Sequence, residues 1–255
     1  MNGLEVPSRI PVRDPRTVAR DIPGLLDIVF PRLSGGLVSS LNRKMFQFNS
    51  ATAVDESLVA QSTQKKSMLF EIAVAYAEQI VSGDEDPDLS RSVSLATQRQ
   101  QRHFDARPPQ PLTEIDRSIV QRVSSNLVNM LNDFAVQQSA DVIVVRPRIP
   151  GFGWIGTGLG DFAVEETLIE VKNTDRNFIA NDYRQILMYW ILSYSKGLEA
   201  GTNVWSKYLL LNSRLNRAVF GSFDALIEAA SGGLSRIEVY EYLRTIVTTP
   251  AEVRK

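Results

Sequence analysis

Residues 160–172 have the sequence GDFAVEETLIEVK, in which two short apolar runs joined near Glu165-Glu166 predict a β-hairpin. Side chains two positions apart in a strand face the same way, so Glu170 and Lys172 share one face, while the apolar side chains beside them point into the core. The hairpin therefore presents an acid and an amine together. We expect its first strand to bring Asp161 beside them.

Helices and strands surround this hairpin in an alternating order that indicates the α/β class. In chain order the predicted elements are a helix that begins after Thr113, a buried strand at residues 141–145, hairpin strands at 161–164 and 167–172, a helix at 182–195, strands at 207–211 and 217–220, and helices at 222–230 and 235–247.

The first part of the chain is predicted to be a mainly helical N-terminal region, residues 1–110. Prolines in residues 107–111 mark a boundary with a second domain at 111–255. Residues 1–16 carry three prolines among charged side chains and predict an extended arm rather than a packed element. The N-terminal region has no recognisable chemistry, and we expect it to cover a substrate channel, form a homo-oligomer or dock a partner.

The composition excludes several kinds of site. The chain has 255 residues, of which 44% are hydrophobic and 22% charged, as in an ordinary globular protein. It has no cysteine, which excludes disulfides, thiolate nucleophiles, iron–sulfur clusters and cysteine-ligated zinc. The single histidine, His103, cannot build a two-histidine metal site, and its polar surroundings favour a surface position. An enzyme of this composition must use carboxylates, lysine, hydroxyls and a hard metal.

Charge and hydropathy limit the partners. Lys and Arg number 28 against 29 Asp and Glu, so the chain lacks an overall basic excess, and any DNA-binding surface must be local. No stretch approaches the roughly 18 consecutive apolar residues of a membrane span, and the first residues do not resemble a secretion signal. We expect a cytoplasmic protein with no membrane partner.

The predicted hairpin suits phosphodiester hydrolysis. If Asp161 and Glu170 converge, their mutual repulsion favours a cation between them, and Mg²⁺ prefers such oxygen ligands. A metal there would lower the pKa of a bound water and stabilise charge on a phosphate, while Lys172 oriented the water. A bare Glu-x-Lys is common by chance, but here a helix follows with Gln185 and Tyr189 four residues apart on one face.

Asp161, Glu170-Val-Lys172 and Gln185-Ile-Leu-Met-Tyr189 together resemble the PD-(D/E)XK nuclease superfamily, in particular its RecB-like branch. The resemblance covers roughly residues 113–220 and implies a restriction-endonuclease-like core, a mixed β-sheet flanked by helices. It also implies that the Asp and Glu ligate Mg²⁺ or Mn²⁺, that the Lys acts at the water, and that the Gln and Tyr support the site or the substrate backbone.

The sequence departs from the family pattern at two points. Gly160 stands where the motif has proline, and the glutamate that the family often adds from the helix before the sheet has only Glu114 as a nearby candidate metal ligand. No Walker A motif is present, so a helicase or ATPase activity must belong to a partner. The family likeness implies a metal-dependent DNA nuclease in bacterial or phage DNA processing, with antiviral defence ahead of repair.

Other interpretations remain open at this stage. The same site fits an RNA or tRNA nuclease, and a non-catalytic nucleic-acid-binding scaffold could keep the fold. In the plainest alternative, Glu170 and Lys172 form a solvated strand face, Asp161 is a turn residue and Gln185 is an exposed helix position. Residues 151–156 spell GxGxxG, but no helix follows directly, so we expect a flexible loop at the mouth of the site instead of a dinucleotide site. Phe152 and Trp154 in this loop would stack on a base or fold back onto the sheet.

Overall fold

The computed structural model describes residues 12–22, 24–101, 109–202 and 204–248. The helices are α1 (Pro15–Asp21), α2 (Leu25–Val29), α3 (Gly35–Asn42), α4 (Glu56–Ala60), α5 (Lys66–Val81), α6 (Leu89–Gln100), α7 (Glu114–Gln137), α8 (Ala180–Ala200), α9 (Phe223–Ser231) and α10 (Arg236–Thr248). The strands are β1 (Ile143–Val145), β2 (Arg148–Ile149), β3 (Gly158–Leu159), β4 (Phe162–Val164), β5 (Thr167–Val171), β6 (Lys207–Asn212) and β7 (Arg217–Ser222).

A five-stranded mixed sheet with the order β1-β4-β5-β6-β7 lies at the centre of this α/β fold. β5 and β6 are parallel, and α8 connects them, because parallel neighbours need a crossover. The other neighbouring pairs are antiparallel. The chain is therefore a mixed α/β protein with helices on both faces of the sheet and a helical N-terminal region, as the sequence predicted.

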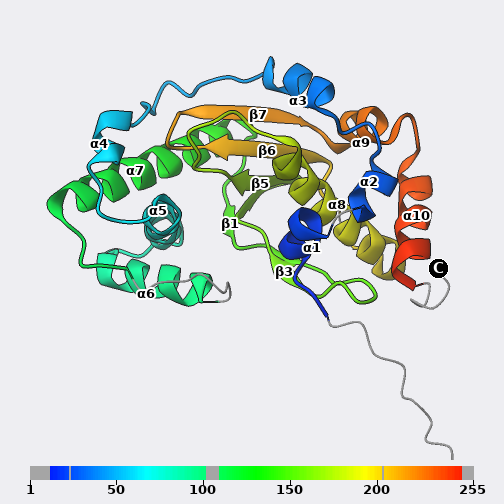
Figure 1. The fold of residues 1–255 in the computed structure, drawn as a ribbon, viewed down its shortest axis with the longest axis horizontal. Coiled ribbons are helices and arrows are strands. Elements are labelled where there is room, and N and C mark those ends of the chain that lie inside the picture. Colours follow the sequence, from blue (N-terminus) through cyan, green and yellow to red (C-terminus); the bar gives the residue numbers. More distant parts are fainter. Residues whose placement is uncertain (1–11, 23, 102–108, 203, 249–255) are drawn as a thin grey trace, which may run out of the picture.

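The two central strands are buried on both faces. In β5, Leu168 packs in the cluster that contains α8, whereas Ile169 packs in the cluster that contains α7. Leu210 and Leu209 of β6 divide between the two clusters in the same way. Figure 1 shows α5, α6 and α7 together at one end of the molecule and α1, α2, α8 and α10 at the other.

The N-terminal region packs directly on the sheet domain. Val18 and Phe30 are buried against α8, and Phe46 pairs with Ala218 at the outer edge of β7. Beyond this edge the chain continues to the α7 face, where α5 packs along α7. The N-terminal region thus covers a sheet edge that would otherwise present unpaired backbone groups.

A buried carboxylate fixes the start of α7. Asp116 completes a capping box with Thr113 and also accepts hydrogen bonds from Ser62 Oγ at 2.5 Å and Thr63 Oγ1 at 2.9 Å. Burial alone would raise the pKa of Asp116, but these hydrogen bonds outweigh it and lower the pKa to about 2. The ionised group therefore holds the 62–63 turn against α7.

Replacing Asp116 by asparagine is expected to lower the free energy of unfolding by about 1–3 kcal/mol at pH 7. The carboxylate stabilises the fold above its unfolded pKa of 3.8, and this contribution is lost as the pH falls through about 2. Urea denaturation of both proteins between pH 2 and pH 7 tests this. Equal stability at pH 7, or a difference that does not shrink in acid, would contradict it.

Three predictions about the elements need correction. Residues 1–11, His103 and residues 107 and 108 of the expected boundary lie outside the described part of the chain. The end of the expected arm is described, and it is packed against the protein. Asp14 caps α1 and Pro15 occupies its first position, where a missing N–H costs nothing. β1 is a half-exposed edge strand rather than a buried one, with Val144 46% exposed. The glycine-rich stretch contains β3, which pairs with β2 in a separate two-stranded sheet.

Among the described helices, none is both long and apolar enough to cross a bilayer.

Candidate active site

The β4–β5 hairpin brings Asp161 beside Glu170. Phe162 pairs with Ile169 in this hairpin, so the residues just outside that pair, Asp161 and Glu170, are also neighbours. Asp161 Oδ2 accepts a hydrogen bond of 2.7 Å from the backbone N–H of Val171. The Asp161 carboxylate is thereby fixed at the start of β4, next to the end of β5.

A hydrogen-bond network joins the hairpin to α8. Lys172 Nζ donates to Glu170 Oε1 at 2.7 Å and to Gln185 Oε1 at 2.8 Å. Gln185 Nε2 donates to the same Glu170 Oε1 at 2.6 Å and to the Tyr189 hydroxyl at 2.9 Å. The amide of Gln185 therefore bridges the carboxylate and the ammonium, because its NH₂ group faces one and its oxygen the other.

All four members of this network are buried. The alternative of a solvated strand face for Glu170 and Lys172 is therefore wrong, and so is an exposed helix position for Gln185. Burial raises the pKa of Tyr189 well above its usual range, and the charge of Glu170 adds to this effect, so its hydroxyl stays neutral. Together with Asp161, these residues form what we call the carboxylate–lysine cluster: Asp161, Glu170, Lys172, Gln185 and Tyr189.

Glu170 is the member of the cluster whose charge is least well stabilised. It is 2% exposed, and its Oε2 atom is buried without a hydrogen-bond partner. Burial and the nearby charge of Asp161 raise the pKa of Glu170 to about 7, although Lys172 and Arg16 work in the opposite direction. An ionised Glu170 thus lacks the full stabilisation that its charge requires.

Two carboxylates, one of which has an unpartnered oxygen, are a donor set that suits a hard divalent cation. Within the described residues no three His, Cys, Asp or Glu side chains gather as metal ligands. Mg²⁺ does not require them, because it is usually bound through one or two carboxylates and keeps several waters. Asp161 and Glu170 are therefore the residues that would hold Mg²⁺ or Mn²⁺.

Glu114 does not join the cluster. Its side chain is 96% exposed and pairs with Arg117 at 3.9 Å. Figure 1 shows the first turn of α7 at the outer end of the helical part, away from β5. Glu78 of α5, in contrast, has Asp161 as an electrostatic neighbour, and it is buried and held by Arg99 and Arg146. Burial, with Asp161 contributing, raises the pKa of Glu78, although Arg99 works against the shift.

The structure also places a cation that the sequence did not suggest. Arg16 of α1 has Glu170 and Asp161 as electrostatic partners. The bridge between Arg13 and Ile155 holds this part of the chain next to the site. No pattern in the sequence predicts that bridge, so the position of Arg16 could not be inferred from the sequence.

The glycine-rich loop folds back onto the protein, against α10 rather than against the sheet. Phe152 packs on Tyr240 with ring centroids 5.9 Å apart, and Trp154 is half-buried in the α8 cluster. Gly153 lies at φ +58, and a Cβ there would be 2.2 Å from a methyl carbon of Val247. A side chain at this position would force the loop off α10, so the glycine is needed for the packing.

The raised pKa of Glu170 predicts a pH-dependent stability. The unfolded chain releases this proton near pH 4.5 and the folded protein only near pH 7, so ionisation opposes folding across this window. In EDTA, the free energy of unfolding of the wild type should fall relative to that of Glu170→Gln as the pH rises from 4.5 to 7, and then level off. Denaturant titrations at intervals of one pH unit test this, and a constant difference between the two proteins would refute the assignment.

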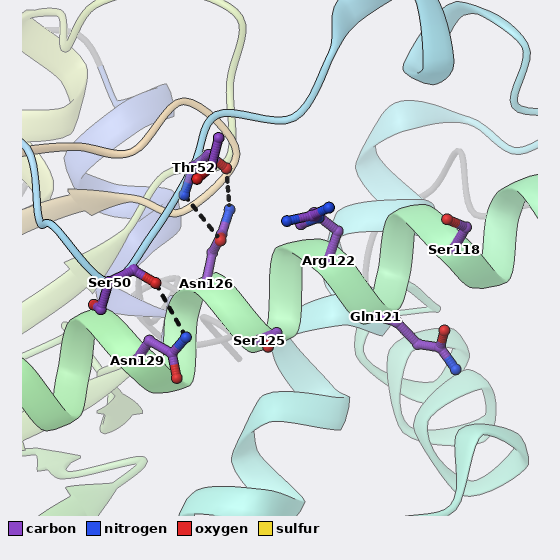
Figure 2. A pocket seen from close by; sticks show the side chains of 8 residues that line it. All are labelled: Ser50, Thr52, Ser118, Gln121, Arg122, Ser125, Asn126 and Asn129. Atoms are coloured by element: carbon purple, nitrogen blue, oxygen red, sulfur yellow. Dashed lines mark hydrogen bonds between the residues drawn. The ribbon is translucent and has the colours of Figure 1, made fainter.

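A polar hollow of about 340 Å³ lies elsewhere, along the outer face of α7. Figure 2 shows Asn126, one of the lining residues, joined by its side-chain amide to the backbone of Thr52. The Asn126 Nδ2 atom also donates to the carbonyl oxygen of Ser213 at 2.9 Å. The amide therefore anchors two chain segments on α7, and no residue of the carboxylate–lysine cluster lines this hollow.

No family model, no curated protein and no solved structure matches the chain. The resemblance to PD-(D/E)XK nucleases rests on the motif residues of the sequence.

Proposed function

We propose that the protein is a metal-dependent DNA nuclease of the PD-(D/E)XK superfamily, with residues 111–255 as its restriction-endonuclease-like domain. One observation carries the proposal: the Glu-x-Lys pair and the Gln-x-x-x-Tyr pair meet in one hydrogen-bonded network, and the Asp, up to 28 positions away in the sequence, is held beside it by the backbone of Val171. A structural ion pair between Glu170 and Lys172 would not require a second carboxylate beside Glu170. It would also not explain why the Oε2 atom of Glu170 is buried without a hydrogen-bond partner.

The residues divide the chemistry of hydrolysis among them. Asp161 and Glu170 would hold Mg²⁺ or Mn²⁺, which would supply a more acidic water and neutralise charge on the phosphate. The Lys172 ammonium orients the attacking water and stabilises the negative charge that develops as the phosphorus–oxygen ester bond breaks. Gln185 fixes the positions of Glu170 and Lys172, and Tyr189 fixes the amide of Gln185.

The near-neutral charge of the chain supports recruitment to DNA by a partner, such as an ATPase or helicase subunit. In this proposal the biological setting is bacterial or phage DNA processing or defence against foreign DNA, in the cytoplasm.

Cleavage of a substrate panel tests the proposal. Purified protein is incubated with supercoiled plasmid, linear duplex, single-stranded DNA and RNA in Mg²⁺, Mn²⁺ or EDTA. We expect DNA to be cut with either metal and to stay intact in EDTA. Cutting of RNA alone would establish an RNA nuclease. No cutting, together with a melting temperature that neither metal raises, would contradict the nuclease and favour a non-catalytic scaffold, because a ligand that binds only the folded state must stabilise it.

A further inference from the structure

The first helix is held beside the carboxylate–lysine cluster from two sides. The N–H of Arg13 donates to the carbonyl of Trp154 at 3.2 Å, and its carbonyl accepts from Gly156 at 2.8 Å. A Cβ at Gly158 would lie 3.1 Å from Pro15 Cδ, so the start of α1 rests on β3, just before Asp161.

The other side of α1 packs on α8. Val18 and Ala19 are buried in the same cluster as Tyr189 of α8. Figure 1 shows α1 lying beside α8. With β3 on one side and α8 on the other, the position of α1 relative to both motif elements is fixed.

Arg16 lies on this fixed helix and has the carboxylates of Glu170 and Asp161 as electrostatic partners. The surrounding protein crowds the guanidinium and works against its charge, but Glu170 and Asp161 outweigh this and raise the pKa of Arg16. The residue nevertheless remains solvent-exposed. Within the described part of the chain, no ion pair or side-chain hydrogen bond engages its guanidinium.

The other cations near the cluster are engaged. Lys172 is buried and donates to Glu170 and Gln185, and Arg99 and Arg146 are both paired with Glu78. Arg16 therefore differs from them, because it is both accessible and uncommitted.

We propose that Arg16 binds a non-bridging phosphate oxygen of the nucleic acid next to the carboxylate–lysine cluster, so that the N-terminal region supplies part of the substrate site. A guanidinium suits this role, since it is always charged and its planar donors match phosphate oxygens in pairs. The inference deepens the proposed nuclease function and rests on it for the identity of the substrate.

Binding of a fluorescent DNA oligonucleotide in EDTA tests the inference without any cleavage. Arg16→Gln is compared with Arg20→Gln, which removes the same charge from an exposed position one turn further along α1. We expect Arg16→Gln to raise the Kd about tenfold, as the loss of one charge-assisted contact does. The slope of log Kd against log salt should also fall by about one. Arg20→Gln should stay within about twofold of wild type, given the small effect of a distant surface charge.

Two further measurements complete the design. Equal melting temperatures of the two variants exclude a folding defect, and Arg16→Lys should restore part of the affinity because it keeps the charge and loses the planar donors. Equal losses in both variants, no loss in Arg16→Gln, or no binding by the wild type would overturn the inference. If the substrate panel shows no cleavage while Arg16→Gln still weakens binding selectively, the nuclease proposal fails and the phosphate contact stands.

Discussion

Replacing Glu170 by glutamine is expected to reduce Mg²⁺-dependent DNA cleavage by at least about 10³-fold, because the variant removes one of the two carboxylates that would hold the metal. The substitution keeps the size of the side chain and removes a buried charge whose pKa is raised to about 7. The fold should therefore survive, and above pH 7 in EDTA the variant should be at least as stable as wild type. Cleavage rates and melting temperatures of both proteins are measured in parallel.

Glu165→Gln is the matched control for this experiment. Glu165 lies in the turn of the same hairpin and is exposed, so the same chemical change there should leave cleavage unaltered. A second readout is the rise in melting temperature on adding Mg²⁺. A ligand at about 100 times its Kd stabilises a protein by about 2.7 kcal/mol, and this gain should be absent in Glu170→Gln. Cleavage at the wild-type rate in Glu170→Gln would remove this residue from the site.

Replacing Lys172 by alanine is expected to reduce cleavage by about 10²–10⁴-fold, since the ammonium that orients the water is lost. The two carboxylates remain, so Mg²⁺ should still raise the melting temperature. In the wild type, Lys172 lowers the pKa of Glu170. In the alanine variant this effect is lost, so the pKa of Glu170 should rise further above 7. Metal binding by Lys172→Ala should therefore need a higher pH than in wild type.

Metal titrations followed by melting temperature at pH 7 and pH 9 measure this shift. Lys207→Ala is a suitable control, because Lys207 forms a surface ion pair with Glu166 in the turn between β4 and β5. Such exposed pairs contribute about 0–1 kcal/mol to stability. If Lys172→Ala cleaved DNA as well as wild type did, the role of this lysine would be refuted.

The elements around the cluster were predictable because each has a strong local pattern. Two short apolar runs within residues 161–172 predicted the hairpin, and the capped apolar stripe after Thr113 predicted α7. The four-residue spacing of Gln185 and Tyr189 placed both on one side of α8, where they meet Glu170. Motif residues on regular elements were thus placed by short-range geometry alone.

The remaining features depend on long-range packing. β2 and β3 have two residues each, too few for a periodic signal, and three prolines obscured α1 and therefore Arg16. Glu78 approaches Asp161 through the packing of α5 near β1, whereas Glu114, nearer the sheet in sequence, faces solvent. Sequence distance is a poor guide to which helical carboxylate reaches a site, because tertiary packing decides it.

The most direct test is single-turnover cleavage of the preferred DNA substrate by wild type and Glu170→Gln, with Mg²⁺ or with EDTA. The account predicts cutting by the wild type in Mg²⁺ only and none by the variant under either condition. Equal cutting by both proteins, or cutting by the wild type in EDTA, would contradict a metal-dependent site built on Asp161 and Glu170.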